Sequence, residues 1–265
     1  MTNNIVEVDM ERIPFVKDLA ANDRPTREKA LSSLQTYLAP SRTLNEIDLL
    51  KIWKGLFYCI HHTASPLPQQ RICASLASLL LSLPAQTFIP FLSAFWKTIG
   101  TNFSAIPSLR LDKYLLLIRY YVASSFTYLH QNNWDAAFLQ FYLDLIGDSE
   151  WGPLTIGGVD GLKNGRGGRV PDGLRYHVLD VWVDGLEAVA ETMDEALVRE
   201  AMKPVQKLAE YGKSKALRMR AKGVIRDERV EAWTREDGSR GLKANSLQPD
   251  NQQPDSGEEW EGLGD

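Results

Sequence analysis

Apolar residues recur at intervals of three and four along almost the whole chain, a pattern that predicts amphipathic helices. The first of these segments follows Asp23 and Pro25, residues that are typical of a helix start. Thr43 and Glu46 have the spacing of a capping box, in which each side chain satisfies an unpaired backbone amide. A second helix is therefore expected to begin at this box.

The same spacing predicts further helices downstream, and no run of residues alternates with period two between turn residues as a strand would. Consecutive apolar helices joined by short loops bury their faces against one another. The chain is therefore expected to be all-α, as an irregular armadillo- or HEAT-like helical stack without a strict sequence period. These further helices are expected at residues 66–83, 84–100, 108–131, 134–146, 174–186 and 196–233.

Two segments depart from the helical pattern. Residues 151–173 contain eight glycines and predict a long loop, and the chain from residue 233 onward is polar. The last stretch, 250–265, has six acidic residues and no basic one. We therefore predict a single α-helical repeat-like domain over residues 1–232, interrupted by this loop, and an acidic tail over 233–265 that is disordered in isolation or folds along a partner.

Residues 72–96 carry no charge, and this run of 25 residues is long enough on paper to cross a bilayer. Pro84 and Pro90 interrupt the run, and six serine, threonine and glutamine residues are spread through it. The pattern favours two buried core helices that break at Pro84, and no membrane span is expected.

Composition narrows the class of protein. The net charge of −4 argues against nonspecific coating of nucleic acid, and no secretory signal is seen in the first nine residues. Cys59 and Cys73 lie in apolar helical patterns, which predicts buried thiols in a reducing compartment. Trp53 and Trp182 lie on apolar stripes and are expected in the core.

Motifs for catalysis and for cofactor or metal binding are missing from the sequence. The glycines near Lys163 lack the spacing and the hydroxyl of a phosphate-binding loop. Cys59, His61 and His62 look like metal ligands, but adjacent side chains on a helix point about 100° apart and no second motif completes a site. We therefore predict no catalytic residue, cofactor, metal or small-molecule substrate.

Basic residues in the glycine-rich loop and in the following helix are the candidates for RNA binding. In the loop, glycine permits close approach to a phosphate backbone and arginine supplies bidentate contacts, although a flexible connector is the alternative. Residues 199–243 hold thirteen basic and seven acidic residues. Five of the basic residues are spaced by 3, 4, 4 and 3, which would form a stripe of about 21 Å on one helix. The loop candidates are Lys163, Arg166 and Arg169, and the helix candidates are Lys215, Arg218, Lys222, Arg226 and Arg229.

This helix also has other interpretations. A merely solvated face explains its stripe about as well as RNA contact, because Asp227, Glu228 and Glu231 dilute the positive charge. Five of the ten residues from Lys213 to Lys222 are basic, and this cluster could serve as a nuclear import signal.

Four segments together resemble a known family. They are Asn22–Asp23 ahead of Thr26–Arg27, residues 49–59 (LLKIWKGLFYC), residues 107–119 (PSLRLDKYLLLIR) and residues 172–177 (DGLRYH). Their order and spacing are similar to those of the ribosomal RNA-processing protein 1 family, over roughly residues 15–190. In the second and third segments, fixed charges lie next to aliphatic residues, as in helices that pack and dock. The candidates for partner contact there are Lys54, Arg110, Lys113 and Arg119.

The resemblance implies a non-enzymatic nucleolar factor that is required for processing precursor rRNA of the large ribosomal subunit. Its partners would be pre-rRNA and other large-subunit assembly factors within an early pre-ribosomal particle, and a separate nuclease would perform cleavage. The alternative is a generic helical-repeat adaptor that binds proteins and has no direct RNA role.

Overall fold

The computed structural model describes residues 15–18, 21, 23–38, 44–156 and 170–235. The chain divides into two compact units, Met1–Thr234 and Arg235–Asp265, and the architecture below is that of the first unit. The division into a folded domain over 1–232 and a separate tail stays a prediction.

Regular structure in the described ranges is helical, with no strand among them. This confirms the predicted all-α fold. The elements, with η marking short 3₁₀ turns, are α1 (Phe15–Asp18), α2 (Arg24–Tyr37), α3 (Glu46–His62), α4 (Pro66–Leu81), α5 (Ala85–Asn102), η2 (Phe103–Ala105), α6 (Ser108–Gln131), α7 (Ala136–Gly147), α8 (Asp172–Glu187), η4 (Ala190–Thr192), α9 (Glu195–Tyr211), α10 (Lys215–Ile225) and α11 (Glu228–Trp233).

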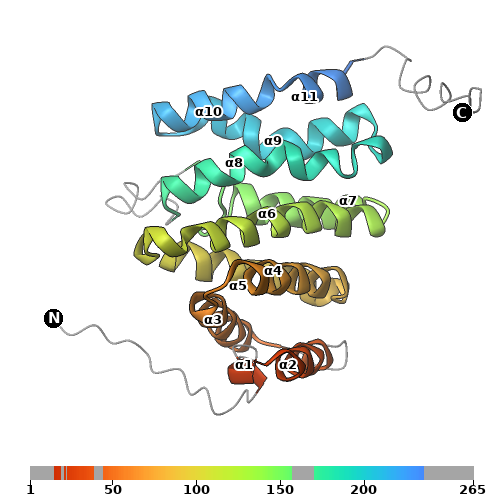
Figure 1. Cartoon of the computed structure of the whole chain (residues 1–265). Coiled ribbons are helices and arrows are strands. Elements are labelled where there is room, and N and C mark those ends of the chain that lie inside the picture. Colours follow the sequence, from red (N-terminus) through yellow and green to blue (C-terminus); the bar gives the residue numbers. More distant parts are fainter. Residues whose placement is uncertain (1–14, 19–20, 22, 39–43, 157–169, 236–265) are drawn as a thin grey trace, which may run out of the picture. The chain divides into compact units, whose positions relative to one another are not determined.

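The helices form a stack of two layers, as Figure 1 shows. One layer contains α3, α5, α7 and α9, each packed on the next, and the other contains α4, α6, α8 and α10 in the same succession. From α3 to α10, helices that follow one another in the chain alternate between the two layers. The predicted helical stack is confirmed. The surfaces described below lie on its faces and at its edges.

Aspartate and asparagine side chains begin several of the helices. Asp23 accepts a hydrogen bond from the Thr26 amide at 2.9 Å, and Asn45 accepts one from the Asp48 amide at 2.9 Å. The predicted capping box at Thr43 is therefore wrong, because Asn45 is the N-cap of α3. The Glu46 carboxylate instead pairs with Lys97 of α5 at 2.6 Å. Thr43 itself lies outside the described residues.

An aromatic cluster holds α3, α5 and α6 together. The Trp53 ring is fully buried, and its centroid lies 5.0 Å from that of Phe91, 4.8 Å from Phe95 and 5.3 Å from Tyr121. The indole N–H of Trp53 donates to the Phe91 carbonyl oxygen at 3.0 Å. Trp182 is also fully buried, so the predicted core positions of both tryptophans are confirmed.

Three buried tyrosines of α6, spaced by seven residues, fasten it to the helices before it. The hydroxyl of Tyr114 donates to the Phe57 carbonyl of α3 at 3.0 Å, and that of Tyr121 donates to the Leu76 carbonyl of α4 at 3.2 Å. The hydroxyl of Tyr128 donates to the carbonyl of Leu83, after α4, at 2.7 Å. Each bond satisfies a hydroxyl that burial would otherwise leave unpaired.

The uncharged run at 72–96 falls in α4 and α5, which are separated at Pro84 as predicted. Among the residues that the structure describes, no helix has the length and hydropathy that a membrane crossing requires. Cys59 and Cys73 are buried thiols, as predicted. Burial raises the pKa of each thiol to about 12.

Candidate interaction surfaces

One edge of the stack carries the amino ends of α6, α8 and α10 (Figure 1). The glycine-rich segment joins α7 to α8 and begins and ends at this edge. Thr155 lies in the described start of this segment, and its carbonyl oxygen accepts a hydrogen bond from Arg175 of α8. Arg175 is 1% exposed, so this buried bond fixes the start of the segment on α8. The predicted RNA contacts Lys163, Arg166 and Arg169 lie outside the described residues, and they stay a prediction.

The basic candidates of α10 divide into two kinds. Lys215, Lys222 and Arg226 are exposed and form no ion pair within the described part of the chain. Arg218, by contrast, is half-buried and donates to the carbonyl oxygens of Gly212 at 2.6 Å and Lys213 at 3.1 Å. These carbonyls follow the carboxyl end of α9 and lack a helical partner, so Arg218 caps that helix.

The continuous basic helix predicted over residues 215–229 is wrong, because α10 ends at Ile225 and α11 begins at Glu228. Asp227 is the N-cap of α11, and its carboxylate accepts a hydrogen bond from the Arg229 amide at 3.0 Å. A capping aspartate thus starts a new helix inside the stripe.

Arg229 turns toward α8 and pairs with three carboxylates. Its guanidinium lies 3.1 Å from Asp184, 2.7 Å from Glu187 and 2.9 Å from Asp227. The hydrogen bond to Asp227 is the main cause of the raised pKa of Arg229. RNA contact by Arg229 stays a prediction, but its charge is already balanced within the fold.

The outer face of α8 carries an acidic row, Asp180, Asp184 and Glu187, and arginines from both neighbouring helices bind it. Arg220 of α10 pairs with Asp180 through two bonds of 2.7 and 2.5 Å, and Arg119 of α6 lies 3.7 Å from Asp184. The sequence did not single out Arg220, because its partner lies 40 residues away. We call these three acids the α8 acidic row. Arg220, Arg119 and Arg229 bind this row and so fasten α8 to α10, α6 and α11.

The amino end of α6 meets the carboxyl end of α3. The Nζ atom of Lys113 donates to the carbonyl oxygens of His61 at 2.8 Å and Thr63 at 2.9 Å, and Arg110 donates to the His61 carbonyl at 3.1 Å. Lys113 is only 4% exposed, and burial lowers its pKa, as does the nearby charge of Arg110. Partner contact by Lys113 stays a prediction, although its ammonium group is occupied inside the fold.

The four predicted partner contacts do not gather on one surface. Lys54 lies on α3 in one layer, whereas Arg110, Lys113 and Arg119 belong to α6 in the other. Lys54 is half-exposed and lies in a row with two exposed apolar side chains of α3, Ile47 and Tyr58. This row at spacings of seven and four is a separate surface from the start of α6.

Histidine and acidic side chains in the described residues form no group of three or more that could hold a metal ion. The Nε2 atom of His177 lies 2.8 Å from the Leu115 carbonyl oxygen, which ties α8 to α6. Burial lowers the pKa of His177. In this structure the His177 side chain therefore serves the packing of α8 on α6.

Comparison with known proteins identifies the family. The model of the family described as "Nucleolar protein, Nop52" matches residues 10–261. Ribosomal RNA processing protein 1 homolog B of Homo sapiens is 30% identical over 185 residues, which is 67% of this chain and 22% of the human protein. Its Mus musculus counterpart is 31% identical over 183 residues, or 66% of this chain and 23% of that protein.

A more distant relative is the ribosomal RNA processing protein 1 homolog of Caenorhabditis elegans. It is 22% identical over 203 residues, which is 75% of this chain and 48% of the worm protein. The chain thus matches less than half the length of each of these three relatives. These matches confirm the resemblance read from the four sequence segments, and the chain belongs to the Nop52 family of nucleolar proteins.

Proposed function

We propose that the protein is a non-enzymatic scaffold in ribosome biogenesis, acting in the nucleolus on an early precursor of the large ribosomal subunit. Its partners would be pre-rRNA and other large-subunit assembly factors, and pre-rRNA processing would depend on it. The observation that carries this proposal is the family match over residues 10–261, together with relatives named for ribosomal RNA processing.

The architecture supports a scaffold role. A two-layer stack presents long outer faces and two edges, which suit the binding of several partners at once. Its buried polar groups hold helices together, as the bonds of Lys113 to α3 and of His177 to α6 illustrate. In this proposal a separate nuclease cuts the RNA, and the chain requires no cofactor, membrane or small-molecule substrate.

The RNA contact would lie where the free positive charge is. Lys215, Lys222 and Arg226 remain available on α10, and Lys215 begins this helix at the edge where the glycine-rich segment also begins and ends. Lys163, Arg166 and Arg169 would extend the contact from that segment. Cations that neutralise phosphates release counterions, so such binding weakens steeply with salt.

Charge reversal on α10 tests this function. The double variant Lys215→Glu, Lys222→Glu of the tagged chain should lose most of its co-sedimentation with large-subunit precursors. The matched control is Lys29→Glu, Lys51→Glu, which changes the same charge on α2 and α3 and should co-sediment normally. Circular dichroism and thermal unfolding would verify that both variants are folded.

Two outcomes would count against the proposal. Normal co-sedimentation of the α10 variant would refute the RNA contact while leaving the scaffold role. Absence of the unmodified tagged chain from the nucleolus and from precursor particles would refute the scaffold role itself, and would favour a general protein adaptor.

A further inference from the structure

A groove separates α2 from α4 at one end of the stack. In this layer α4, α6, α8 and α10 pack on one another in succession, whereas the extensive packing of α2 is on α1. Two hollows, of about 360 and 250 Å³, lie in the resulting space. They share Arg27, Pro68 and Ile72 as lining residues, so they form one continuous feature, which we call the α2–α4 groove.

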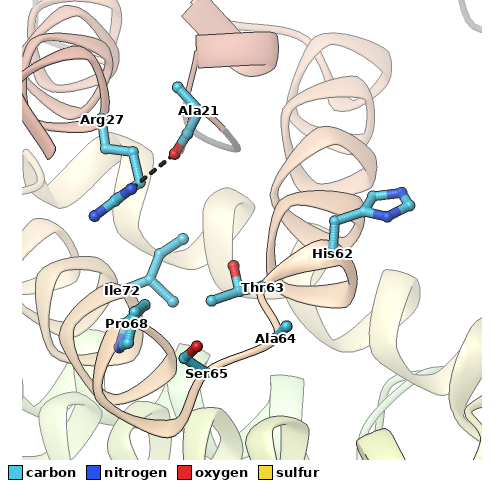
Figure 2. A pocket seen from close by; sticks show the side chains of 8 residues that line it. All are labelled: Ala21, Arg27, His62, Thr63, Ala64, Ser65, Pro68 and Ile72. Carbon is cyan, nitrogen blue, oxygen red and sulfur yellow. Dashed lines mark hydrogen bonds between the residues drawn. The ribbon is translucent and has the colours of Figure 1, made fainter. Parts of the chain in front are cut away.

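Aliphatic side chains form the floor of the α2–α4 groove. Leu31 of α2 and Ile72 of α4 are half-buried against the core, and Leu76 below them is fully buried. Pro68 and the exposed Ala74 continue the floor along α4. No phenylalanine, tyrosine or tryptophan is among the described residues that line either hollow. The imidazole of His62 points away from Ile72 in Figure 2, so the floor offers little for a nucleic-acid base to stack on.

Arginines form the rim of the groove. Arg24, Arg27 and Arg71 line it, and among the described lining residues the one acid is Glu28, which pairs with Arg24 at 2.5 Å. Figure 2 shows Arg27 on α2 facing Pro68 and Ile72 of α4 across the hollow, with one guanidinium nitrogen donating to the Ala21 carbonyl at 2.7 Å. The rim thus has an excess of positive charge in a chain whose net charge is −4.

We propose that the α2–α4 groove binds a short peptide segment of a partner protein in which acidic residues flank aliphatic ones. The carboxylates would pair with the exposed Arg71, since guanidinium groups bind carboxylates through charge-assisted hydrogen bonds. The aliphatic side chains would cover Leu31 and Ile72, removing apolar surface from water. A positive rim over an aliphatic floor, with no aromatic side chain pointing at Leu31 or Ile72, favours such a peptide over RNA. The inference goes beyond the proposed function, because it does not require the RNA contact on α10.

A direct binding measurement tests the groove. The probe is a fluorescein-labelled peptide of about eight residues in which aspartate and leucine alternate, titrated with the full chain and followed by fluorescence anisotropy. We expect saturable binding. Serine in place of leucine, or lysine in place of aspartate, should weaken it by about tenfold or more, because each removes one half of the complementarity.

Two variants locate the binding on the protein. Arg71→Glu reverses charge on the exposed rim, and Ala74→Trp fills the floor from an exposed position; each should weaken binding by about tenfold. Lys222→Glu on α10 is the matched control and should bind the peptide normally. Circular dichroism would show whether each variant is folded, and either groove variant alone is sufficient for the test.

Several results would overturn the proposal. They are absence of saturable binding, equal affinity for the serine-substituted peptide, or unchanged affinity in the folded groove variants. An oligouridine that displaces the peptide, and whose own binding Arg71→Glu weakens, would make the groove a nucleic-acid site instead. Self-association of the chain that Arg71→Glu abolishes, seen by sedimentation, would assign the groove to a second copy.

Discussion

The ammonium group of Lys113 donates a hydrogen bond of 2.8 Å to the carbonyl oxygen of His61, and this bond joins the first turns of α6 to the last turn of α3. The last carbonyls of a helix have no partner within the helix and carry partial negative charge. Lys113 satisfies a second such carbonyl, that of Thr63 at 2.9 Å. A charged side chain that is almost fully buried is thereby paired without a carboxylate.

Replacing Lys113 by methionine keeps the length of the side chain and leaves both carbonyls without this donor. Lys113→Met should lower the free energy of unfolding by about 1–3 kcal/mol, measured by urea denaturation. Lys54→Met is the control, because Lys54 is half-exposed and should change stability by less than about 0.5 kcal/mol. Equal stability of the two variants would show that the Lys113 bonds contribute nothing.

Trp53 should be among the most sensitive core positions, since its ring contacts Phe91, Phe95 and Tyr121. Trp53→Ala should cost about 3–5 kcal/mol of unfolding free energy, because it removes a large buried side chain and leaves a cavity. Trp53→Phe keeps a ring and should cost less, although it removes the donor to the Phe91 carbonyl. A loss below about 1 kcal/mol in Trp53→Ala, measured by urea denaturation, would contradict the packing described here.

Stability should fall as the pH is lowered below neutrality, in part because of His177. Its pKa in the folded chain lies below the ordinary value of 6.5, chiefly because burial disfavours the charged ring. The unfolded chain therefore binds the proton first as the pH falls through 6.5, which favours unfolding until the lower folded pKa is passed. Above 6.5 this residue adds no pH dependence.

The variant His177→Gln isolates this contribution. Urea denaturation between about pH 7.5 and pH 5 should show a shallower loss of stability in His177→Gln than in the unmodified chain. Some slope should remain, because burial also lowers the pKa of His61. Parallel curves for the two proteins would rule out His177 as a source of the pH dependence.

Arg229 and Lys222 offer a comparison between a paired and an unpaired cation. Arg229→Gln removes the contacts to Asp184, Glu187 and Asp227 and should lower stability by up to about 1 kcal/mol, because these pairs are partly exposed. Lys222→Gln should leave stability unchanged and weaken association with precursor particles more strongly. The measurements are thermal unfolding and gradient co-sedimentation of the same two variants. A stronger effect of Arg229→Gln on association would place RNA contact at Arg229.

Helix positions were predictable where the local pattern was strong. The expected bounds of α6, residues 108–131, agree with the structure because a proline precedes an uninterrupted helical pattern. The separation of α4 from α5 at Pro84 was predictable for the same reason. The break between α10 and α11 was missed because the basic spacing continues across it, although Asp227 is a typical capping residue and could have indicated it.

The roles of the charged candidates could not be predicted from spacing. Lys113 reaches its acceptors across about 50 residues of chain, and Arg229 reaches Asp184 across 45. Helical spacing tells which side chains share a face, but not which neighbouring helix that face meets. The internal bonds of Lys113 to α3 and of Arg229 to α8 therefore became recognisable only from tertiary contacts.

The hydrogen bonds of the three tyrosine hydroxyls of α6 should make this helix resistant to local unfolding. They clamp its amino end, its middle and its carboxyl half to three successive places in the preceding chain, while its other side packs on α8. Hydrogen exchange should accordingly be slowest in α6 and faster toward α2 and α11, so the array frays from its termini inward. The centre of the array should then be the last part of the fold to open.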